Sequence, residues 1–492
     1  MIDRRRFLGA AGSAALASSV SGAATAAMDR QAPVGSDASA HADYTIRIAT
    51  GLVELGADTT VSTKTYNGQF PGPLMRLQEG KRVVVDIHND TDAPEQLHWH
   101  GQFLPVNVDG AAEEGTPFIA ARGHRRIALT PQPSGFRFFH SHVRAGADLS
   151  RGLYSGQAGL VYIEPRRNSG AYDQEIFLTL KEFGPWLSRT EMAFDSLSPI
   201  DVVPALRAQA LAALDASLKR GLPQAYELAY EFYSVNGRSL GQGEPIRVKP
   251  GERALLHVLN ASASEIRSLA LPGHVFKVVA LDGNPVPRPA EVPVLWLGPA
   301  ERISAIVEMK MPGVWVLGDT DDDARAKGAG IVVEYSGRKG APQWAKPGPF
   351  RWDYRRFADP AATAAQPDET LVLTFAVRNA AREGFDEFTI NGVPFSMERM
   401  QPRFPLVRGR RYRLRLRNAT DDTHPIHLHR HSFELTSIAG HPTAGVMKDV
   451  VLIGGFQEMT VDFVADQPGL SLFHCHMQHH MDFGFMALFD CS

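Results

Sequence analysis

The chain repeats one sequence unit three times, and no other feature constrains its fold as strongly. Each copy contains an Asn-Gly pair, a later glycine, a short alternating run and a second asparagine nine residues after that glycine. The later glycines and second asparagines are Gly80 with Asn89, Gly251 with Asn260, and Gly409 with Asn418. Glycines and asparagines that bound short β-rich runs are typical of turns between strands. The repeat therefore predicts an all-β protein of three tandem β-sandwich domains.

Two segments interrupt this pattern. We place the three domains, each near the ~150 residues usual for one domain, at residues 44–165, 172–337 and 369–492. Residues 199–222 predict one helix inserted in the middle domain. Its apolar residues at helical spacing are Leu211, Leu214 and Leu218. Residues 338–368 are rich in proline, alanine and glycine, and they predict a linker into the third domain.

Residues 1–27 resemble a twin-arginine signal peptide. Three arginines, Arg4 to Arg6, precede a weakly apolar run of alanine, serine and glycine, and Ala24-Thr25-Ala26 fits a cleavage site. The alternative is an alanine-rich tail without a targeting role. The signal predicts export of the folded protein by the twin-arginine machinery, and therefore a periplasmic or extracellular location.

Composition excludes several classes of protein. A formal net charge of -3 gives no indication of a nucleic-acid partner. After the first 30 residues no apolar stretch is long enough to span a bilayer. There are only two cysteines, Cys475 and Cys491, so Cys475 is available for chemistry. The sequence gives no indication of the oligomeric state.

The first and third copies carry histidine pairs at equivalent positions. Nine and eleven residues after the second asparagine stand His98 and His100 in copy one, and His427 and His429 in copy three. Five and seven residues after a later turn glycine stand His140 and His142, and then His474 and His476. Copy two has Leu269, Leu271, Gly318 and Thr320 there. Residues i and i+2 of a strand share one face, so each pair presents two imidazoles together.

Eight imidazoles exceed the needs of one metal ion. We therefore expect a cluster of several ions between copies one and three. A single His-x-His pair could be structural, but four at repeat-equivalent positions favour metal binding. Cys475 lies between His474 and His476, so strand alternation points its sulfur to the opposite face. His424 and His480 are its natural partners, and one cysteine with two histidines is typical of a blue-copper site. An electron at Cys475 is then one peptide unit from either flanking histidine.

These motifs resemble those of three-domain multicopper oxidases of the bacterial laccase type. The motifs are His98 to Gly101, His140 to His142, His424 to His429, and His474 to His480, and the resemblance covers the mature chain. It implies cupredoxin-like Greek-key β-sandwich domains and about four copper ions. It implies His424, Cys475 and His480 as type 1 ligands, and His98 and His427 as type 2 ligands. The implied type 3 ligands are His100, His140, His142, His429, His474 and His476.

The resemblance also implies an axial residue and an acid. The axial position of the type 1 copper falls on Phe485, which cannot coordinate, so a raised potential is expected. Met486 is the alternative if the chain bulges. Asp109 matches a family carboxylate that supplies protons to dioxygen, and its alternative role is a turn-forming Asp-Gly. Met481 stands where some relatives have a second acid, with Asp482 next to it, so the second proton donor is unassigned.

We interpret the other singled-out side chains as ordinary. His431 and His479 are expected beside ligands or in solvent. His41, His88, His124, His257, His274 and His441 have no partner motif in the sequence and are expected to be ordinary. The arginines from Arg411 to Arg417 predict a solvated strand face. Asp319 and Asp321 to Asp323 predict an exposed acidic loop.

The expected function is a laccase-type oxidase. It couples four one-electron oxidations of phenols or aromatic amines, through an exposed edge of His480 or His424, to reduction of dioxygen to water. A cuprous or other metal-ion oxidase in metal tolerance is the alternative. A copper-free cupredoxin scaffold is a minor alternative because no ligand is missing.

Overall fold

The computed structural model describes residues 41–165, 172–188, 202–221 and 225–492. The predicted signal peptide at residues 1–27 lies outside these ranges, so export stays a prediction. In the part of the chain that is described, no helix has the length and apolar character needed to cross a membrane.

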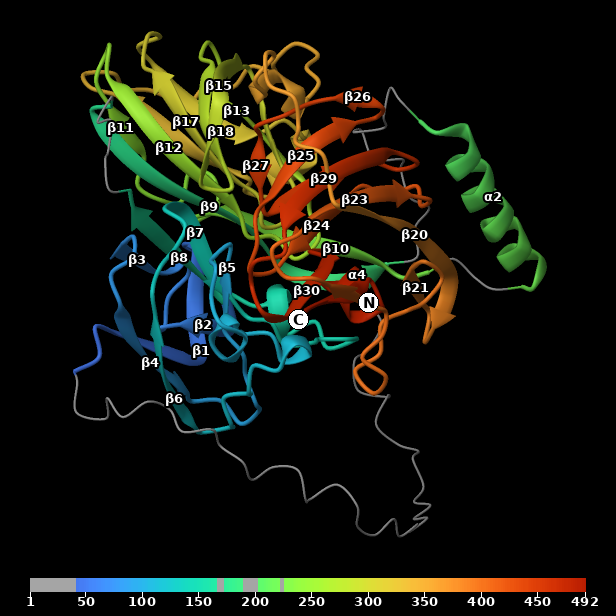
Figure 1. The fold of residues 1–492 in the computed structure, drawn as a ribbon. Helices are drawn as coiled ribbons and strands as arrows, with labels where there is room; N and C mark the ends of the chain where they lie inside the picture. The colour runs from blue at the N-terminus through green and yellow to red at the C-terminus, as the bar shows by residue number, and fades with distance from the viewer. Residues whose placement is uncertain (1–40, 166–171, 189–201, 222–224) are drawn as a thin grey trace, which may run out of the picture. The chain divides into compact units, whose positions relative to one another are not determined.

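The first domain consists of two four-stranded sheets (Figure 1). One has the order β2-β1-β4-β6, with β1 (Tyr44–Gly56), β2 (Thr59–Tyr66), β4 (Val83–Asn89) and β6 (His124–Leu129). The other has the order β3-β8-β7-β5, with β3 (Gly72–Gln78), β5 (His98–His100), β7 (Gly135–His140) and β8 (Ala158–Glu164). The loops between the strands contain short helical turns, namely α1 (Val106–Asp109), η1 (Ala112–Glu114) and η2 (Gly152–Tyr154).

The middle domain also has two sheets. The six-stranded sheet, β10-β9-β12-β17-β14-β15, contains β9 (Gln174–Ser188), β10 (Glu227–Val235), β12 (Arg253–Asn260), β14 (Phe276–Leu281), β15 (Asn284–Val292) and β17 (Arg302–Glu308). The five-stranded sheet, β11-β19-β18-β13-β16, contains β11 (Ile246–Val248), β13 (Arg267–Ala270), β16 (Leu295–Leu297), β18 (Val314–Asp319) and β19 (Gly330–Tyr335). The domain also contains α2 (Pro204–Lys219) and α3 (Asp322–Ala326).

The third domain has the same plan. Its larger sheet, β21-β20-β23-β29-β25-β26 with β27 on β25, contains β20 (Glu369–Arg382), β21 (Phe385–Ile390), β23 (Arg411–Asn418), β25 (Phe433–Ile438), β26 (His441–Pro442), β27 (Met447–Lys448) and β29 (Glu458–Val464). Its smaller sheet, β22-β31-β30-β24-β28, contains β22 (Arg403–Leu406), β24 (His424–Leu428), β28 (Val450–Ile453), β30 (Gly469–Cys475) and β31 (Met486–Cys491). The helix α4 (Gln478–Asp482) lies between β30 and β31 in sequence.

The sheet orders confirm the three-fold repeat. In each domain the first strand pairs in parallel with the strand that ends at the second asparagine of the repeat. The orders β3-β8-β7-β5, β11-β19-β18-β13 and β22-β31-β30-β24 correspond strand by strand. The histidine-bearing strands β5 and β24 therefore occupy one position, and β13 of the middle domain occupies the same position without ligands. The predicted all-β, three-domain fold is confirmed.

The second asparagine of each repeat ends its strand with a turn. Asn89, Asn260 and Asn418 are all 0% exposed. Each side-chain oxygen accepts a hydrogen bond from the backbone N–H two residues later, at 3.0, 3.1 and 3.0 Å. An asparagine that satisfies its own turn in this way fits a structural role.

The helix α2 covers most of the predicted segment 199–222, but the three leucines at helical spacing do not form its buried side. Leu211, Leu214 and Leu218 are 51%, 41% and 51% exposed. Instead Leu206, 1% exposed, packs with Ala419 and Phe456 of the third domain. The helix lies beside β20 (Figure 1), and near its other end the buried Ser217 accepts a hydrogen bond from Asn379 of β20 at 3.4 Å.

The predicted linker at 338–368 is partly a packed segment. Trp352, Tyr354 and Phe357 are at most 8% exposed and belong to the hydrophobic core that the middle and third domains share. The Tyr354 hydroxyl donates to Glu301 at 2.5 Å. Three aromatic side chains within a region rich in small residues are enough to fix it between the two domains.

Two predictions about charged side chains hold for some of the residues and are wrong for others. Asp319 is 2% exposed and accepts a hydrogen bond from Ser268 at 3.2 Å, although Asp321 to Asp323 are exposed as expected. The arginines of β23 do not simply face solvent. Arg413 donates through Nε to the buried carboxylate of Asp462 on β29 at 2.8 Å, and Arg411 does so at 3.1 Å. Opposite charges on adjacent strands pair across the sheet, a contact that one strand's sequence cannot reveal.

Candidate metal centre

The four His-x-His pairs meet where the first and third domains face each other. Within the first domain His98 pairs with His140 in the register of β5 and β7, and within the third His427 pairs with His474 in that of β24 and β30. Between the domains, the rings of His98 and His429 stack with centroids 4.0 Å apart, and those of His100 and His427 at 3.8 Å. The predicted convergence of the pairs from copies one and three is confirmed.

These histidines fall into three groups in which the potential ligand atoms lie within 4.8 Å of one another. The groups are His98, His100 and His427; His100, His140 and His476; and His142, His429 and His474. All eight histidines are at most 2% exposed. So dense a set of buried imidazoles offers many nitrogen donors to metal ions in a small volume.

Hydrogen bonds to main-chain oxygens fix four of these eight rings through Nδ1. The Nδ1 atoms of His98, His140, His427 and His474 lie 3.0, 2.8, 2.7 and 2.8 Å from main-chain oxygens. A carbonyl oxygen can only accept, so each Nδ1 carries the proton and each Nε2 keeps its lone pair. This is the arrangement of metal-ligating histidines, whose other nitrogen donates to a carbonyl or carboxylate.

The free nitrogens fit metal ions in spacing and in protonation. His429 Nε2 and His474 Nε2 are 3.0 Å apart, as expected of two nitrogens that share an ion at about 2.0 Å. Among the described residues, Nε2 of His98, Nε2 of His427 and both ring nitrogens of His476 have no hydrogen-bond partner. Burial lowers the pKa of seven of the eight well below the ordinary histidine value, with nearby imidazoles adding to the effect. Neutral imidazoles are the form that binds metal.

A fourth group surrounds the cysteine. The Sγ atom of Cys475 lies 3.7 Å from Nδ1 of His424 and 3.4 Å from Nδ1 of His480. The Thr420 hydroxyl, 2.6 Å from Nε2 of His424, orients that ring. Burial raises the pKa of the Cys475 thiol, so a cation is needed to keep the sulfur as thiolate. One thiolate and two imidazoles are the donor set of a blue-copper site.

Comparison with known proteins assigns the family. Family models described as multicopper oxidase match residues 48–168, 208–335 and 363–492. The protein named multicopper oxidase MmcO of Mycobacterium tuberculosis is 30% identical, over 99% of this chain and 96% of its own length. The chain belongs to the multicopper oxidase family. It is therefore a copper-dependent oxidoreductase that uses dioxygen.

Other relatives extend the comparison. The bilirubin oxidase of Albifimbria verrucaria is 27% identical over 87% of this chain and 72% of its own length. The solved multi-copper oxidase of Pseudomonas thermotolerans superposes with a TM-score of 0.67 and 24% identity, covering 92% of this chain and 100% of that one. These structural neighbours have three cupredoxin domains, which confirms the predicted fold class.

Phe485 lies on the cysteine side of this multicopper oxidase's fourth histidine group. Its ring, 0% exposed, has its centroid 4.8 Å from that of His424, and it belongs to the same core cluster as Cys475. Met486 belongs to a different cluster, with Leu472 and Met481. The packing therefore favours Phe485, and not Met486, beside the cysteine.

The prediction that His480 or His424 exposes a ring edge was wrong. His424 is 0% exposed and His480 is 3% exposed. The ring of Phe388 covers His480 with a centroid distance of 4.1 Å, and His479 packs on the same ring at 4.1 Å. Aromatic neighbours from β21 and α4, which the strand pattern around Cys475 could not indicate, shield both ligands.

Asp109 lies inside the histidine cluster. Its carboxylate is 0% exposed and lies 2.9 Å from Nδ1 of His429 and 3.0 Å from Nδ1 of His98. The Asp-Gly turn is present as well, since Gly110 ends α1 with φ of 108°. Two buried acids that the sequence did not single out lie nearby. Glu114 is 3.4 Å from Nδ1 of His429, and Glu113 is 3.6 Å from Nδ1 of His142.

A buried acid lies next to Met481, the position where some relatives have a second proton donor. Met481 is buried in an apolar cluster and offers no proton. The neighbouring Asp482 is 1% exposed and accepts hydrogen bonds from the backbone of Ala145 and Gly146, at 2.9 and 2.8 Å. Burial raises the pKa of Asp482 to about 6 and that of Glu113 to about 7.

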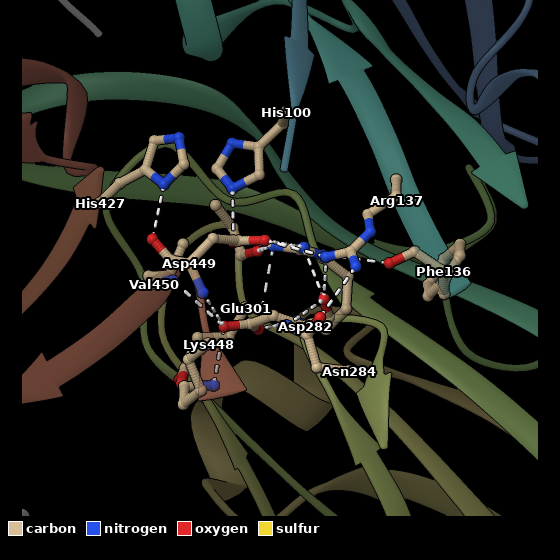
Figure 2. Close-up of polar contacts among 12 residues, drawn as sticks. His100, Phe136, Arg137, Asp282, Asn284, Glu301, His427, Lys448, Asp449 and Val450 are labelled. Atoms are coloured by element: carbon tan, nitrogen blue, oxygen red, sulfur yellow. Dashed lines mark hydrogen bonds and ion pairs between the residues drawn. The ribbon is translucent and has the colours of Figure 1, made fainter. Parts of the chain in front are cut away.

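A buried ionic network is the main feature that sequence reasoning missed (Figure 2). The Asp449 carboxylate lies 3.1 Å from Nε2 of His100, and its main-chain oxygen accepts from Nδ1 of His427 at 2.7 Å. Arg302 and Arg137 bind the same carboxylate. No short motif connects these residues, because they come from three different domains.

Four of the remaining singled-out histidines, His257, His274, His88 and His124, lie away from the four groups. His257 and His274 are buried and hydrogen-bonded, to Ser304 at 2.8 Å and to Tyr335 at 2.6 Å. His88 and His124 lie together on β4 and β6, with centroids 4.6 Å apart. His431 is 4% exposed and lies 3.0 Å from the oxygen of His429, so its expected place beside a ligand is confirmed.

Proposed function

We propose that this multicopper oxidase holds about four copper ions, one in the cysteine group and three among the eight histidines. His424, Cys475 and His480 would hold the type 1 ion, and His98 and His427 the type 2 ion. His100, His140 and His476, with His142, His429 and His474, would hold the type 3 pair. When bound, these ions would supply one-electron chemistry at the cysteine group and four-electron reduction of dioxygen at the histidine cluster. Cys475 is bonded through the chain to His474 and His476, which gives a covalent route between them.

We propose a laccase-type activity, in which four one-electron oxidations of a phenol or aromatic amine accompany reduction of one dioxygen to two waters. A cavity of about 310 Å³ carries this proposal. It is lined by Trp296, Phe350 and Trp352, and also by Thr423, the residue before His424. Aromatic walls suit an aromatic reductant. Residues 351–356 add three arginines and one aspartate, which disfavours a metal cation there.

Electron entry is then through the protein around His424. Because no ligand ring is exposed, a reductant in the cavity would contact Thr423, one peptide unit from His424. Relatives named laccase, such as Laccase-4 of Thanatephorus cucumeris at 23% identity over 84% of this chain, support an organic reductant.

A second candidate is oxidation of cuprous or other metal ions. Glu227 of β10 and Asp386 of β21 are mostly buried near Asp421, and burial together with the neighbouring carboxylates raises the pKa of Glu227 to about 7. Asp386 stands two residues before Phe388, whose ring covers His480. Closely placed carboxylates attract a cation. A relative named copper resistance protein A, from Pseudomonas syringae, is 29% identical over 49% of this chain.

One experiment separates the two candidates. Purified, copper-reconstituted protein should contain about four coppers, and its kcat/KM should be higher for phenols than for Cu(I). Arg351→Ala should raise KM for phenols that bear a carboxylate, whereas Asp386→Asn should leave phenol oxidation unchanged. Preferred turnover of Cu(I), lost in Asp386→Asn, would establish the alternative. No copper after reconstitution would end both proposals.

Replacement of Phe485 by methionine should lower the type 1 reduction potential. A thioether placed beside the cysteine can donate to Cu(II), and a phenyl ring cannot. We expect a fall of at least about 60 mV, a tenfold change in a one-electron equilibrium, measured by redox titration of the blue absorption. Met486→Leu is the matched control, because that side chain packs in the other cluster. Equal potentials in Phe485→Met and wild type would show that residue 485 does not face the copper.

A further inference from the structure

We propose that Asp449 is a positioning residue that selects which ring nitrogen of His100 faces copper, and that the middle domain holds Asp449 in place through Arg302. The domain without histidine ligands would then help to build the histidine cluster. This inference rests on the proposed copper assignment.

His100 is oriented differently from its neighbours. His98, His140, His427 and His474 each direct Nδ1 to a main-chain oxygen. In His100 the outer nitrogen is Nε2, which lies 3.1 Å from the Asp449 carboxylate, while Nδ1 lies 3.3 Å from Nε2 of His140. A carboxylate between two arginines accepts hydrogen bonds, so Nε2 of His100 carries the proton. Its Nδ1 is the nitrogen left with a lone pair for metal.

Arg302 holds the Asp449 carboxylate by two parallel bonds. Its Nη1 donates to Oδ1 at 2.7 Å and its Nη2 to Oδ2 at 2.6 Å. Arg137 of β7 donates to Oδ2 at 3.1 Å. All three side chains are 0% exposed. A bidentate arginine fixes the plane of a carboxylate as well as its charge, and this plane determines where Oδ1 meets His100.

The middle domain anchors this contact on both sides (Figure 2). Arg302 begins β17 and donates to the main-chain oxygens of Ala300 and Asp282, at 2.9 and 3.1 Å. The Asp282 carboxylate accepts from the backbone N–H of Asp449 and Val450, at 3.2 and 3.1 Å. The segment that carries Asp449 is therefore held at its main chain and at its side chain by one domain.

The charges of the network balance. Lys448 bridges Asp282 at 2.9 Å and Glu301 at 3.0 Å. Together with Asp449, Arg302 and Arg137 the network contains three carboxylates and three cations, all at most 2% exposed. A buried network of this kind tolerates no unpaired member, so it resists rearrangement when the histidines bind or lose metal.

Replacement of Asp449 by asparagine tests the proposal. The asparagine amide must place its NH2 group, a donor, at a position where the surrounding groups are also hydrogen-bond donors. Both carboxylate oxygens of Asp449 receive hydrogen bonds: Oδ1 from His100 and Arg302, and Oδ2 from Arg302 and Arg137. In Asp449→Asn the NH2 group meets two cationic donors at the Oδ2 position, but only one at the Oδ1 position. The NH2 group should therefore turn to His100 and donate to its Nε2. This favours the His100 tautomer with the proton on Nδ1, and a protonated Nδ1 cannot bind metal.

The experiment uses the full-length chain, stripped of copper and reconstituted. Copper affinity is measured by competition with a chelator, the cysteine site by its blue absorption, and the paired ions by electron paramagnetic resonance, in which a coupled cupric pair gives no signal. We expect Asp449→Asn to retain the blue absorption, to bind copper at the histidine cluster about 10–100-fold more weakly, and to show a cupric signal additional to those of the type 1 and type 2 ions.

Asp462→Asn is the matched control. Asp462 is also a buried carboxylate of the third domain bonded to two arginines, but it contacts none of the eight histidines. Parallel loss of blue and cluster copper in both variants would show a merely structural role and overturn the proposal. Unchanged copper coupling and affinity in Asp449→Asn would overturn it as well. A wild-type protein without a coupled pair would instead refute the copper assignment.

Arg302→Lys keeps the test decisive if Asp449→Asn does not fold. Lysine preserves the buried positive charge but cannot form the two parallel bonds that fix the carboxylate plane. We expect the same spectroscopic change with a smaller loss of copper affinity. Wild-type coupling in Arg302→Lys would show that Arg302 does not position Asp449, and it would overturn that part of the proposal.

Discussion

Replacement of Cys475 by serine is expected to abolish the blue absorption and to reduce oxidase activity more than any other single change. The thiolate is the one sulfur donor of the fourth group, 3.4 Å from Nδ1 of His480, and it is also the start of the bonded route to His474 and His476. Changes behind a metal ligand typically cost about 10–100-fold, and loss of the ligand itself should exceed that range. Steady-state kcat and the visible spectrum of the reconstituted protein measure the effect.

Cys491→Ser is the control for this change. Cys491 is also buried, at 3% exposed, and its thiol donates to the Ala465 carbonyl at 3.4 Å. It lies on β31 away from the histidines, so its replacement should leave colour and turnover at wild-type levels. If Cys475→Ser remained blue, or if both variants lost colour equally, Cys475 would not be the type 1 ligand.

Replacement of Asp109 by asparagine should slow the reaction with dioxygen by about 10²-fold or more, the range of a general acid, without slowing reduction by the substrate. Dioxygen takes up four protons on its way to two waters, and Asp109 is the carboxylate that contacts histidines of two groups, His98 and His429. Stopped-flow reoxidation of the fully reduced enzyme measures the first rate, and anaerobic bleaching of the blue absorption measures the second.

Glu182→Gln provides the comparison for Asp109→Asn. Glu182 is a 0% exposed carboxylate of the middle domain that accepts from the backbone of Ala263 at 2.5 Å, away from the histidine cluster. It should leave both rates unchanged. Normal reoxidation in Asp109→Asn would show that Asp109 serves only to form the turn with Gly110. Glu114 would then be the next proton donor to test.

The sequence predicted the ligands because their chemistry is local and repeated. A strand alternates faces every residue, so His98 and His100, or His474 and His476, share one face wherever the strand is placed. Comparison of the copies then separated ligand-bearing positions from Leu269 and its equivalents in the middle domain. The periodicity of α2 failed for the opposite reason. Its leucines face solvent, and one residue of its first turn, Leu206, packs against the third domain.

Only the tertiary structure revealed what surrounds the ligands. Asp449 is 349 residues from His100 and 147 from Arg302 in sequence, and Asp109 is 320 from His429. A charged residue in a strand or turn has the same local pattern whether it faces water or another domain's arginine. The repeat therefore determined which histidines and which cysteine can bind metal. Tertiary packing decided which nitrogen His100, His427 and His429 offer, because hydrogen-bond partners from distant segments fix the proton of each of these rings. His140 and His474 instead use the main-chain oxygen of the next residue.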